Sequence, residues 1–471
     1  MFEIEGIKDL KSLANVIDGE LFSSNEIFTN LTVDSREACP GAVYLALKGD
    51  SYDGNIFCQN ALENGCIAVI TEDSETLGRY ILVEDCYIAL LKLASFHQKQ
   101  INPLTIAITG SNGKTSVKEM MGEILDKDNT VITNSNENNQ FGIPYTILRC
   151  NKSTENLILE CGARHDGDFS QIVDYLTFDS LVITNINNSH VGVFGSIDNI
   201  INTKLELMSA IKPSGTIIEA AFENLCNGRQ LNIKTEKINI YENKKQNEIE
   251  LIHSWSYSCQ TSTEGRDHFN LLLRSNDEVM KFDHQASINH NCINAVLASM
   301  TLREYDYEIN NSMESLNHFE NPLMNRFHIN NLFNYQLIDD TYNANPASMI
   351  SALNAINAWE DKKSRVVILG DMYDLGEHSE KEHQNLIVRS LELDNLKYLI
   401  LVGERFKSAL DKVKHDQKYK ILHIHNKIDE FPYKRVFHHP IKEGILLVKG
   451  SRAMKMERFV QSISKYINKN Q

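Results

Sequence analysis

The sequence has no excess of positive charge, no long apolar run and no paired-cysteine motif. Its 63 acidic residues outnumber 47 basic ones, giving a formal net charge of −16, which argues against a general binder of nucleic acid or anionic membranes. No apolar stretch approaches the roughly 18 to 20 residues of a membrane span, and the acidic start MFEIEGIKDL is unlike a signal peptide. The nine cysteines are scattered without a C-x-x-C pair, as in reduced cytosolic thiols. We therefore expect a cytoplasmic protein that binds neither nucleic acid nor membrane.

The chain is too long for a single core. With 471 residues, 42% hydrophobic and 23% charged, it has the composition of an ordinary globular protein of two or three domains. We see no internal repeat and no low-complexity tract. We divide the chain into a small unit at 1–98, a central domain at 99–322 and a third domain at 323–471. The stretch INP at 101–103 looks like a linker, because Pro103 ends the preceding helix, and Asn321-Pro322 is the predicted hinge before the third domain.

Short apolar runs alternate with helical patterns in the central domain. These runs are LTIAI at 104–108, LILE at 157–160, LVITN at 181–185 and GTII at 215–218. The alternation is typical of a parallel sheet covered by helices, and it begins again near 323. We expect the weakly patterned, polar segment 221–286 to form β-hairpins or an excursion at the edge of the central domain. The predicted fold class is α/β in three domains: a small N-terminal domain, a central parallel-sheet domain and a C-terminal Rossmann-like domain.

The stretch TGSNGKTS at 109–116 follows the strand LTIAI and opens an amphipathic helix. Backbone N–H groups of such a glycine turn, at a helix N-terminus, can hold phosphate oxygens. Lys114 would place a positive charge on the outer phosphates, and the Thr115 hydroxyl can ligate Mg²⁺. The common P-loop pattern has a further glycine at the position of Ile108. We interpret the stretch as a nucleotide-binding loop, because an ordinary strand-to-helix turn would not need Lys followed by Thr.

Two polar residues follow neighbouring strand patterns. Glu160 ends LILE, and His190 comes after LVITN. In an open α/β sheet the carboxyl ends of the strands face the ligand crevice, so both side chains would converge on Thr115. A carboxylate and an imidazole beside nucleotide phosphates suit a divalent metal ion. Taken alone, His190 would be an ordinary loop histidine and Lys204 a solvated surface lysine.

Ordered motifs in all three domains are similar to one family. They are VDSREACPGAVYLALKGDSYDG (33–54), TGSNGKT (109–115), NENNQFGIP (136–144), ECGARHDG (160–167), ITNINNSHVGVFGS (183–196), TKLEL (203–207), IDDTYNANPASM (338–349), LGDMYDLGEHSEKEH (369–383) and LVKGSRAMKME (447–457). Together they resemble the Mur ligase family, the ATP-dependent amide ligases of peptidoglycan synthesis. The third-domain motifs resemble most the member that adds D-alanyl-D-alanine to UDP-N-acetylmuramoyl-tripeptide.

The resemblance implies a reaction and its ligands. The peptide carboxylate of UDP-N-acetylmuramoyl-tripeptide would attack the γ-phosphate of ATP, giving an acyl phosphate and ADP. The amine of D-Ala-D-Ala would then displace phosphate and form an amide. The protein would contribute positioning and charge neutralisation. Its three domains would bind the three ligands and close over the reaction. Two Mg²⁺ ions are implied as cofactors.

Residue roles carry over from the family by position. Lys114 would hold the β- and γ-phosphates, Thr115 and Glu160 would ligate one Mg²⁺, and His190 a second. The family often has a carbamylated lysine at the position of Lys204, and a carbamate, unlike an ammonium, can ligate a metal. The further ATP-binding residues would be Thr109, Gly110, Ser111, Asn112, Gly113, Ser116, Asn294, Arg326, Asp340, Asn343, Asn345 and Pro346. The substrate-binding residues would be Ser35, Arg36, Asp53, Gly54, Asn138, Asn139, Lys449 and Arg452.

Several positions depart from the family pattern without removing a proposed phosphate or metal ligand. They are Asn55, Cys161, Val191-Gly192, Ile288, Asn325 and Asp374. We interpret Cys161 and Cys292 as packing residues. The departures indicate a diverged member and not a different reaction.

Other functions stay open at this point. A sister ligase adding a single amino acid, or a folate-polyglutamate ligase, would share the fold. A nucleotide-gated binding protein that hydrolyses ATP as a timer would need no acceptor site, and a catalytically dead scaffold would not need Lys114, Glu160 and His190. We expect a monomer.

Overall fold

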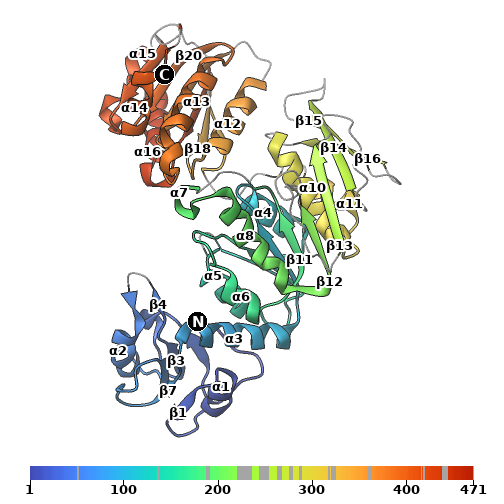
Figure 1. Ribbon diagram of the computed structural model, residues 1–471, viewed down its shortest axis with the longest axis vertical. Coiled ribbons are helices and arrows are strands. Elements are labelled where there is room, and N and C mark those ends of the chain that lie inside the picture. The colour runs from blue at the N-terminus through green and yellow to red at the C-terminus, as the bar shows by residue number, and fades with distance from the viewer. Residues whose placement is uncertain are drawn as a thin grey trace.

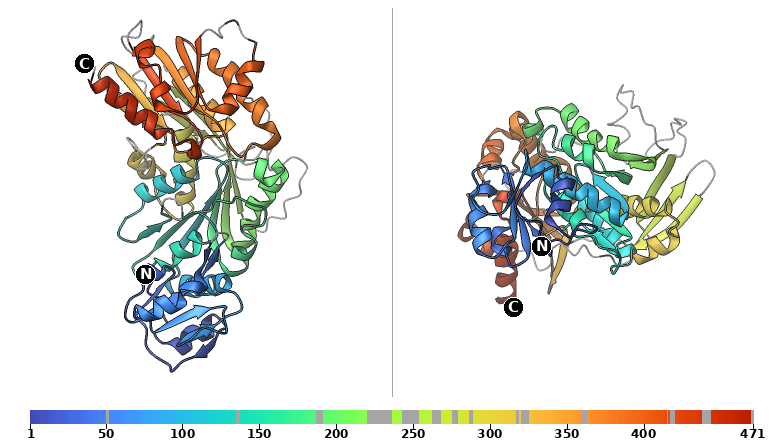
Figure 2. Two further views of the ribbon diagram at one scale, coloured as in Figure 1. Left: turned by 90° about the vertical axis from the view of Figure 1, so that its left-hand side faces the viewer. Right: turned by 90° about the horizontal axis from the view of Figure 1, so that it is seen from below.

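The three domains are stacked along the long axis of the molecule, with the first at one end and the third at the other (Figures 1 and 2). The computed structural model describes residues 1–49, 52–134, 137–186, 191–219, 236–242, 254–261, 268–274, 279–285, 289–316, 319, 325–358, 363–414, 416, 420–437 and 444–469, without the side chains of 219, 236–292 and 358. The α/β fold class in three domains is confirmed. The exact domain boundaries remain predictions, and the hinge expected at Asn321-Pro322 lies outside the described residues.

The first domain is a small α/β unit. Its five-stranded sheet has the order β1-β7-β6-β3-β2, in which only β1 runs antiparallel to its neighbour. The strands are β1 (Glu20–Phe22), β2 (Asn30–Thr32), β3 (Ala42–Leu45), β6 (Ala68–Thr71) and β7 (Tyr80–Leu82), and β4 (Lys48–Gly49) pairs with β5 (Tyr52–Asp53). The helices are α1 (Leu10–Val16), η1 (Ser35–Glu37), η2 (Gly54–Phe57) and α2 (Cys58–Glu63).

One long helix leads from the first domain to the second. α3 (Cys86–Ile101) begins where the Asp85 carboxylate accepts hydrogen bonds from two backbone N–H groups of the first turn, which caps the helix. It ends at Asn102, which has a left-handed conformation with φ 52°, and Pro103 follows. The predicted end of this helix at the proline is confirmed. Since α3 runs through residue 98, the first two domains share a continuous helix.

The central domain is built on a nine-stranded sheet of order β16-β15-β14-β13-β12-β11-β8-β10-β9. Its strands are β8 (Leu104–Thr109), β9 (Thr130–Ile132), β10 (Asn156–Glu160), β11 (Phe178–Ile183), β12 (Ile211–Glu219), β13 (Glu236–Glu242), β14 (Ser254–Thr261), β15 (His268–Arg274) and β16 (Val279–Gln285). The strands from β9 to β14 are parallel, and β14, β15 and β16 are joined antiparallel. The hairpins expected at this edge are confirmed for β14 to β16, whereas β13 extends the parallel part.

Helices cover both faces of the parallel part. Along β8, Ile106 and Ile108 pack toward α4 and α10, and Ala107 packs with the opposite core, because alternate side chains of a strand face opposite sides. The helices are α4 (Lys114–Ile124), α5 (Gly142–Leu148), α6 (Ser170–Tyr175), α7 (Val191–Phe194), α8 (Ile197–Glu206), η3 (Leu207–Ala210), α10 (Asn289–Arg303) and α11 (Ile309–Ser315). The apolar face predicted for the helix after Lys114 is confirmed as core.

The third domain is a six-stranded sheet of order β17-β18-β22-β19-β20-β21, with β17 alone antiparallel. Its strands are β17 (His328–Leu332), β18 (Tyr335–Asp340), β19 (Ser364–Gly370), β20 (Leu396–Val402), β21 (Ile421–Ile424) and β22 (Gly444–Lys449). Its helices are α12 (Pro346–Ala358), η4 (Gly376–His378), α13 (Ser379–Leu391), α14 (Glu404–Lys412), η6 (Ile428–Glu430), α15 (Tyr433–Phe437), η7 (Arg452–Met454) and α16 (Glu457–Lys469). Among the helices described in all three domains, none is long and apolar enough to cross a membrane.

A candidate nucleotide site between two domains

The glycine turn between β8 and α4 is set by close contacts that exclude side chains. Gly110 has φ 141°, and a Cβ there would lie 2.0 Å from the Thr184 hydroxyl oxygen. Gly113 has φ 85°, and a Cβ there would lie 2.6 Å from Oδ1 of Asn294. Glycine accepts both conformations at no steric cost. The loop can therefore turn tightly into the start of α4, where the first backbone N–H groups of the helix have no hydrogen-bond partner within it.

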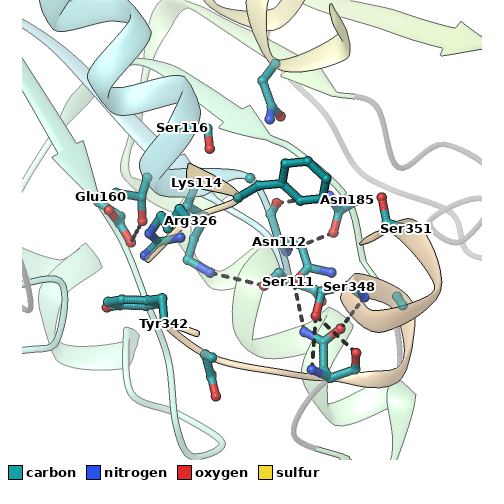
Figure 3. Close-up of a pocket in the computed structure, with 18 of the residues that line it drawn as sticks. Ser111, Asn112, Lys114, Ser116, Glu160, Asn185, Arg326, Tyr342, Ser348 and Ser351 are labelled. Atoms are coloured by element: carbon teal, nitrogen blue, oxygen red, sulfur yellow. Dashed lines mark hydrogen bonds between the residues drawn. The ribbon is translucent and has the colours of Figure 1, made fainter. Parts of the chain in front are cut away.

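Asn185, just beyond β11, holds this loop in place (Figure 3). Its Oδ1 accepts a hydrogen bond of 2.9 Å from the N–H of Asn112, and its Nδ2 donates one of 2.9 Å to the carbonyl of Asn112. The Thr184 hydroxyl donates to the same carbonyl at 2.5 Å. β11 lies beside β8 in the sheet, so the end of one strand fixes the loop that leaves the other.

Two lysines, the partly buried Lys114 and the buried Lys204, meet at one carbonyl oxygen. Lys114 Nζ donates to the Gly110 carbonyl at 2.7 Å, and Lys204 Nζ donates to the same oxygen at 3.1 Å. Burial lowers the pKa of both amines, and that of Lys204 falls to about 7. Desolvation disfavours the charged form, and the two lysines also repel each other. An anion bound at the loop would relieve both effects.

A carboxylate faces the first turn of α4. Glu160, at the end of β10, accepts a hydrogen bond of 3.0 Å from the Thr115 hydroxyl on its Oε1. The side-chain amide of Asn138 donates to the same oxygen at 2.8 Å. The predicted convergence of Glu160 on Thr115 is confirmed. His190, expected to join them, lies outside the described residues, and in the described part of the chain no three His, Cys, Asp or Glu side chains cluster as a metal site.

The third domain closes this region from the other side. Arg326 stacks on the ring of Tyr342, with its guanidinium carbon 3.8 Å from the ring centre (Figure 3). Its Nε is buried with no hydrogen-bond partner, which is costly for a cation and marks a group that can accept an anionic ligand. Asn345, before α12, donates from Nδ2 to Oδ1 of Asn112 at 2.8 Å. The phosphate loop thus touches the third domain directly.

Together the two domains enclose a cavity of 520 Å³, a size that suits a small-molecule ligand. The predicted residues that line it are Ser111, Asn112, Gly113, Lys114, Thr115, Ser116, Asn138, Glu160, Asn294, Arg326, Asp340, Asn343, Asn345 and Lys449. Lys449 is already paired. Its Nζ lies 2.7 Å from a carboxylate oxygen of Asp340 and donates to the Asn343 carbonyl at 2.9 Å. Lys449 therefore stabilises the third-domain wall of the cavity and also places a positive charge there.

Other predicted residues do not line the cavity. Thr109 donates to the Cys161 carbonyl at 3.0 Å, beneath the loop. Asn139 accepts from the N–H groups of Phe141 and Gly142 and so supports α5. Arg452 is largely exposed, and its guanidinium lies 3.6 Å from the carboxylate of Glu457. Gly110 and Pro346 are chain neighbours of the lining residues Ser111 and Asn345, and Lys204 donates to the Gly110 carbonyl.

The residues expected to face uridine lie in the first domain, outside the cavity lining. Arg36 is exposed and its guanidinium lies 2.6 Å from the Asp34 carboxylate; Ser35 precedes it in η1. Asp53 accepts from the Asn55 N–H at 2.9 Å, and Gly54 begins η2 with its carbonyl accepting from Tyr44. Cys161 is fully buried, and burial raises the pKa of its thiol to about 12, as expected of a packing residue.

Several lining residues were missed by the sequence reasoning. Tyr342 and Asn185 stand inside quoted motifs, and the position of Asn185 at the end of the predicted strand LVITN was a usable signal. Arg164 also lies in a quoted motif and lines the cavity. Ser348, which lies in the quoted motif 338–349, lines it from the third domain together with Ser351 and Phe327, and no local pattern distinguishes the last two from ordinary helix and loop residues.

A glycine phosphate loop on a parallel sheet, closed by a separate α/β domain, defines a three-domain nucleotide-binding protein. Three family models match the chain: "Mur ligase family, catalytic domain" over 27–128, "Mur ligase middle domain" over 108–302 and "Mur ligase, glutamate ligase domain" over 325–452. Together they cover most of its length. The chain belongs to the Mur ligase family.

Individual relatives match nearly from end to end. The UDP-N-acetylmuramoyl-tripeptide--D-alanyl-D-alanine ligase of Buchnera aphidicola subsp. Acyrthosiphon pisum is 29% identical over 469 residues, covering 97% of this chain and 98% of the relative. The Escherichia coli protein of the same name is 28% identical over 473 residues, covering 96% and 98%. Among solved structures, MurF from Acinetobacter baumannii superposes with a TM-score of 0.81 at 25% identity, covering 97% of this chain and 98% of that one. MurF ligase from Thermotoga maritima in complex with ADP has a TM-score of 0.80 at 22% identity, covering 94% and 98%, and so supports the fold.

Proposed function

We propose that this chain is an ATP-dependent amide ligase that joins D-alanyl-D-alanine to UDP-N-acetylmuramoyl-tripeptide. One observation carries the proposal: a phosphate loop of the central domain lines one cavity together with an arginine of the third domain, Arg326, whose buried Nε has no hydrogen-bond partner. Two domains that share a nucleotide site suit a reaction in which ATP activates a second molecule. The names of the near-full-length relatives supply the substrates.

The charges around the cavity support ATP as the phosphate donor. Lys114 and Lys204 have backbone carbonyl oxygens as hydrogen-bond partners, and Arg326 keeps a buried N–H without one. A triphosphate would supply negative charge to all three. Loop N–H groups at the start of α4 would hold its oxygens, as at other helix N-termini.

The reaction needs little covalent work from the protein. A carboxylate oxygen of the tripeptide substrate bonds to the γ-phosphorus as the bond to the β,γ-bridging oxygen breaks, and ADP leaves. The amine of D-Ala-D-Ala then attacks the carbonyl carbon of the acyl phosphate, loses a proton, and expels inorganic phosphate. Lys114 and Arg326 would hold and neutralise the transferring group, and closure of the cavity would keep water from the acyl phosphate.

The residues present fit a Mg²⁺ ion. The Thr115 hydroxyl and a Glu160 oxygen lie 3.0 Å apart beside the phosphate loop, and Mg²⁺ is usually bound by one or two protein oxygens together with substrate phosphates and water. When bound, the ion would neutralise phosphate charge. His190 is proposed as a ligand of a second ion.

Lys204 is proposed to carry a carbamate. Its amine is buried, and its pKa of about 7 gives a substantial neutral fraction near neutral pH, which is the form that adds CO₂ with loss of one proton. A carbamate would present oxygens to a metal ion where an ammonium cannot. Bicarbonate labelled with ¹³C should give a carbamate resonance that is absent from Lys204→Ala, and the lack of such a difference would remove this part of the proposal.

Substrate recognition beyond ATP is also proposed by position. Ser35, Arg36, Asp53 and Gly54 would face the uridine diphosphate. Asn138, which contacts Glu160, and Lys449 stand at the cavity wall where the activated peptide would lie. Arg452 is exposed beside this wall and would meet the carboxylate of the dipeptide.

Phosphate release with product mass spectrometry tests the function. ATP and Mg²⁺ are supplied with UDP-N-acetylmuramoyl-tripeptide and D-Ala-D-Ala, singly and together. We expect turnover with both substrates and a pentapeptide product. Turnover with a single amino acid would indicate a sister ligase, and turnover without any acceptor would contradict the ligase function while keeping the nucleotide site.

A further inference from the structure

A backbone-to-backbone contact joins the central and third domains at a second place. The N–H of Gly192, in the short helix α7, donates a hydrogen bond of 3.1 Å to the carbonyl of Asp374 in the third domain. The backbone of Gly376 lies against the same glycine. This contact is separate from the one between Asn112 and Asn345.

The third domain leaves no room for a side chain at Gly192. A Cβ there would lie 2.3 Å from the Gly376 nitrogen, 2.9 Å from the Asp374 carbonyl oxygen and 2.9 Å from the Gly376 Cα. Real Cβ atoms essentially never come closer than 3.0 Å to such atoms. These three nearest atoms all belong to the third domain. No atom of the central domain is among the three nearest, so the steric requirement for glycine comes from the third domain.

The conformation of Gly192 does not demand a glycine either. It lies in a helix, and its φ is outside the positive range that favours glycine. Glycine costs about 1 kcal/mol relative to alanine inside a helix. The close approach of the other domain is therefore the physical reason for this residue.

Both sides of the contact are firmly anchored. Val191 and Phe194 bury α7 in the central core. On the other side, Leu375 is buried in the core of the third domain, while Asp374 and Gly376 both have left-handed backbones with φ 63° and 52°. A turn held in this way presents its backbone outward without a side chain between the domains.

The turn is also linked to the wall of the nucleotide cavity. The N–H of Tyr373 donates to the Ser451 hydroxyl at 2.9 Å, and Ser451 stands two residues after Lys449, which lines the cavity. A shift of the 374–376 turn would therefore move the loop that follows β22. The turn that contacts Gly192 and the wall of the cavity therefore belong to one connected part of the third domain.

We propose that Gly192 is a positioning residue. Its N–H binds the 374–376 turn, and its lack of a side chain lets the turn come close, so that Gly192 sets the distance between the third domain and the phosphate loop. The docked position is the one that brings Arg326, Asn345 and Lys449 to the cavity. Gly192 itself touches no reacting group. Its effect on the reaction rests on the proposed function, and its effect on domain position does not.

Gly192→Ala tests the proposal, with Val193→Ala as the matched control. Val193 is the next residue of α7 and its side chain is 44% exposed. Alanine favours the helix, so the melting temperature of Gly192→Ala should be unchanged or higher. A misplacement near 1 Å can reduce a rate about 100-fold, so we expect kcat to fall by about that factor. Val193→Ala should keep the wild-type kcat.

Small-angle scattering with a non-hydrolysable ATP analogue separates the two proposals. Gly192→Ala should give a longer maximum dimension than the wild type and Val193→Ala in the presence of the analogue. This result would support the docking role even if no ligase activity were found. Identical scattering profiles and an unchanged kcat for Gly192→Ala would overturn it, as would an equal loss in Val193→Ala.

Discussion

The side chains of Asn345 and Asn112 form a hydrogen bond of 2.8 Å between the third domain and the phosphate loop. Both residues are tied down on their own side. The backbone of Asn112 is held by Asn185, and Oδ1 of Asn345 accepts from the Ser348 N–H at 2.8 Å as an N-cap of α12. The bond therefore transmits the position of one rigid element to another. A nucleotide in the loop would lie in the cavity whose two walls this bond joins.

A double-mutant cycle should detect coupling between these two side chains. Asn345→Ser keeps a neutral N-cap acceptor for α12 but cannot reach Asn112, and Asn112→Ala removes the acceptor. Each single change should lower kcat/KM for ATP by about 2- to 10-fold, the worth of a net hydrogen bond. The double variant should be no worse than the poorer single variant. Fully additive losses would show that the bond carries no coupling.

Arg326 should matter more for nucleotide binding than for stability. Its buried Nε lacks a partner, so Arg326→Gln removes a group whose burial costs about 1–3 kcal/mol and loses a stacking contact with Tyr342 worth about 0.5–2 kcal/mol. The ligand-free melting temperature should therefore change little. The rise in melting temperature on adding ATP should shrink markedly, because the guanidinium with the unbonded Nε is gone.

Arg365 provides the control for this prediction. It is fully buried, and its guanidinium donates to the carbonyls of Ile356 and Asp394 at 2.9 and 2.8 Å. Arg365→Gln should destabilise the ligand-free protein by about 3 kcal/mol, since bonds to a charged group are lost in the core. If Arg326→Gln destabilised the protein as strongly as Arg365→Gln, the interpretation of Arg326 as an anion-binding and not a structural residue would be wrong.

Much of the fold could be read from local patterns. Runs such as LTIAI and LILE became β8 and β10 because an apolar, β-rich run of this length can be buried on both faces of a parallel sheet. The glycine loop was recognisable because glycines followed by Lys and Thr, between a strand pattern and a helix pattern, are the residue types that a phosphate-binding turn requires. Convergence of Glu160 on Thr115 followed from the rule that ligands bind at the carboxyl ends of parallel strands.

What could not be read depends on contacts between distant segments. The pairing of Lys449 with Asp340 arises because β22 lies beside β18. The sequence of neither strand indicates which strand will be its neighbour. Gly192 was noted only as a departure from the family pattern, since no turn or conformation of its own requires glycine. Its reason lies in a turn nearly two hundred residues later, at Asp374 and Gly376.

The Thr115 hydroxyl should be required for the response to Mg²⁺. Thr115→Ser keeps an oxygen beside Glu160, whereas Thr115→Val removes it at nearly constant volume. Loss of one such ligand should lower kcat by about 100-fold and raise the Mg²⁺ concentration for half-maximal rate. Thr115→Ser should stay close to the wild type in both quantities. Equal magnesium curves for Thr115→Val and the wild type would exclude this hydroxyl as a ligand.

His97 should make the junction of the first two domains sensitive to acid. The ring is almost fully buried at 1% exposure. Its Nδ1 accepts from the N–H of Glu5 at 3.0 Å, so its Nε2 carries the proton and donates to the carbonyl of Cys150 at 2.8 Å. Burial is the main cause that lowers the pKa of His97 below its ordinary 6.5, because a charged ring would be poorly solvated and would lose its acceptor.

The sign of the effect follows from proton binding in the two states. Between the lowered folded pKa and the ordinary value of 6.5, the unfolded chain binds a proton that the folded chain does not, so stability falls as pH drops through this window. One such group contributes a slope of up to about 1.4 kcal/mol per pH unit. Urea unfolding at several pH values between 7.5 and 5 should show this slope in the wild type. His97→Gln, which does not titrate, should be less stable at pH 7.5 but should lose less stability on acidification, and parallel curves for the two proteins would contradict the assignment.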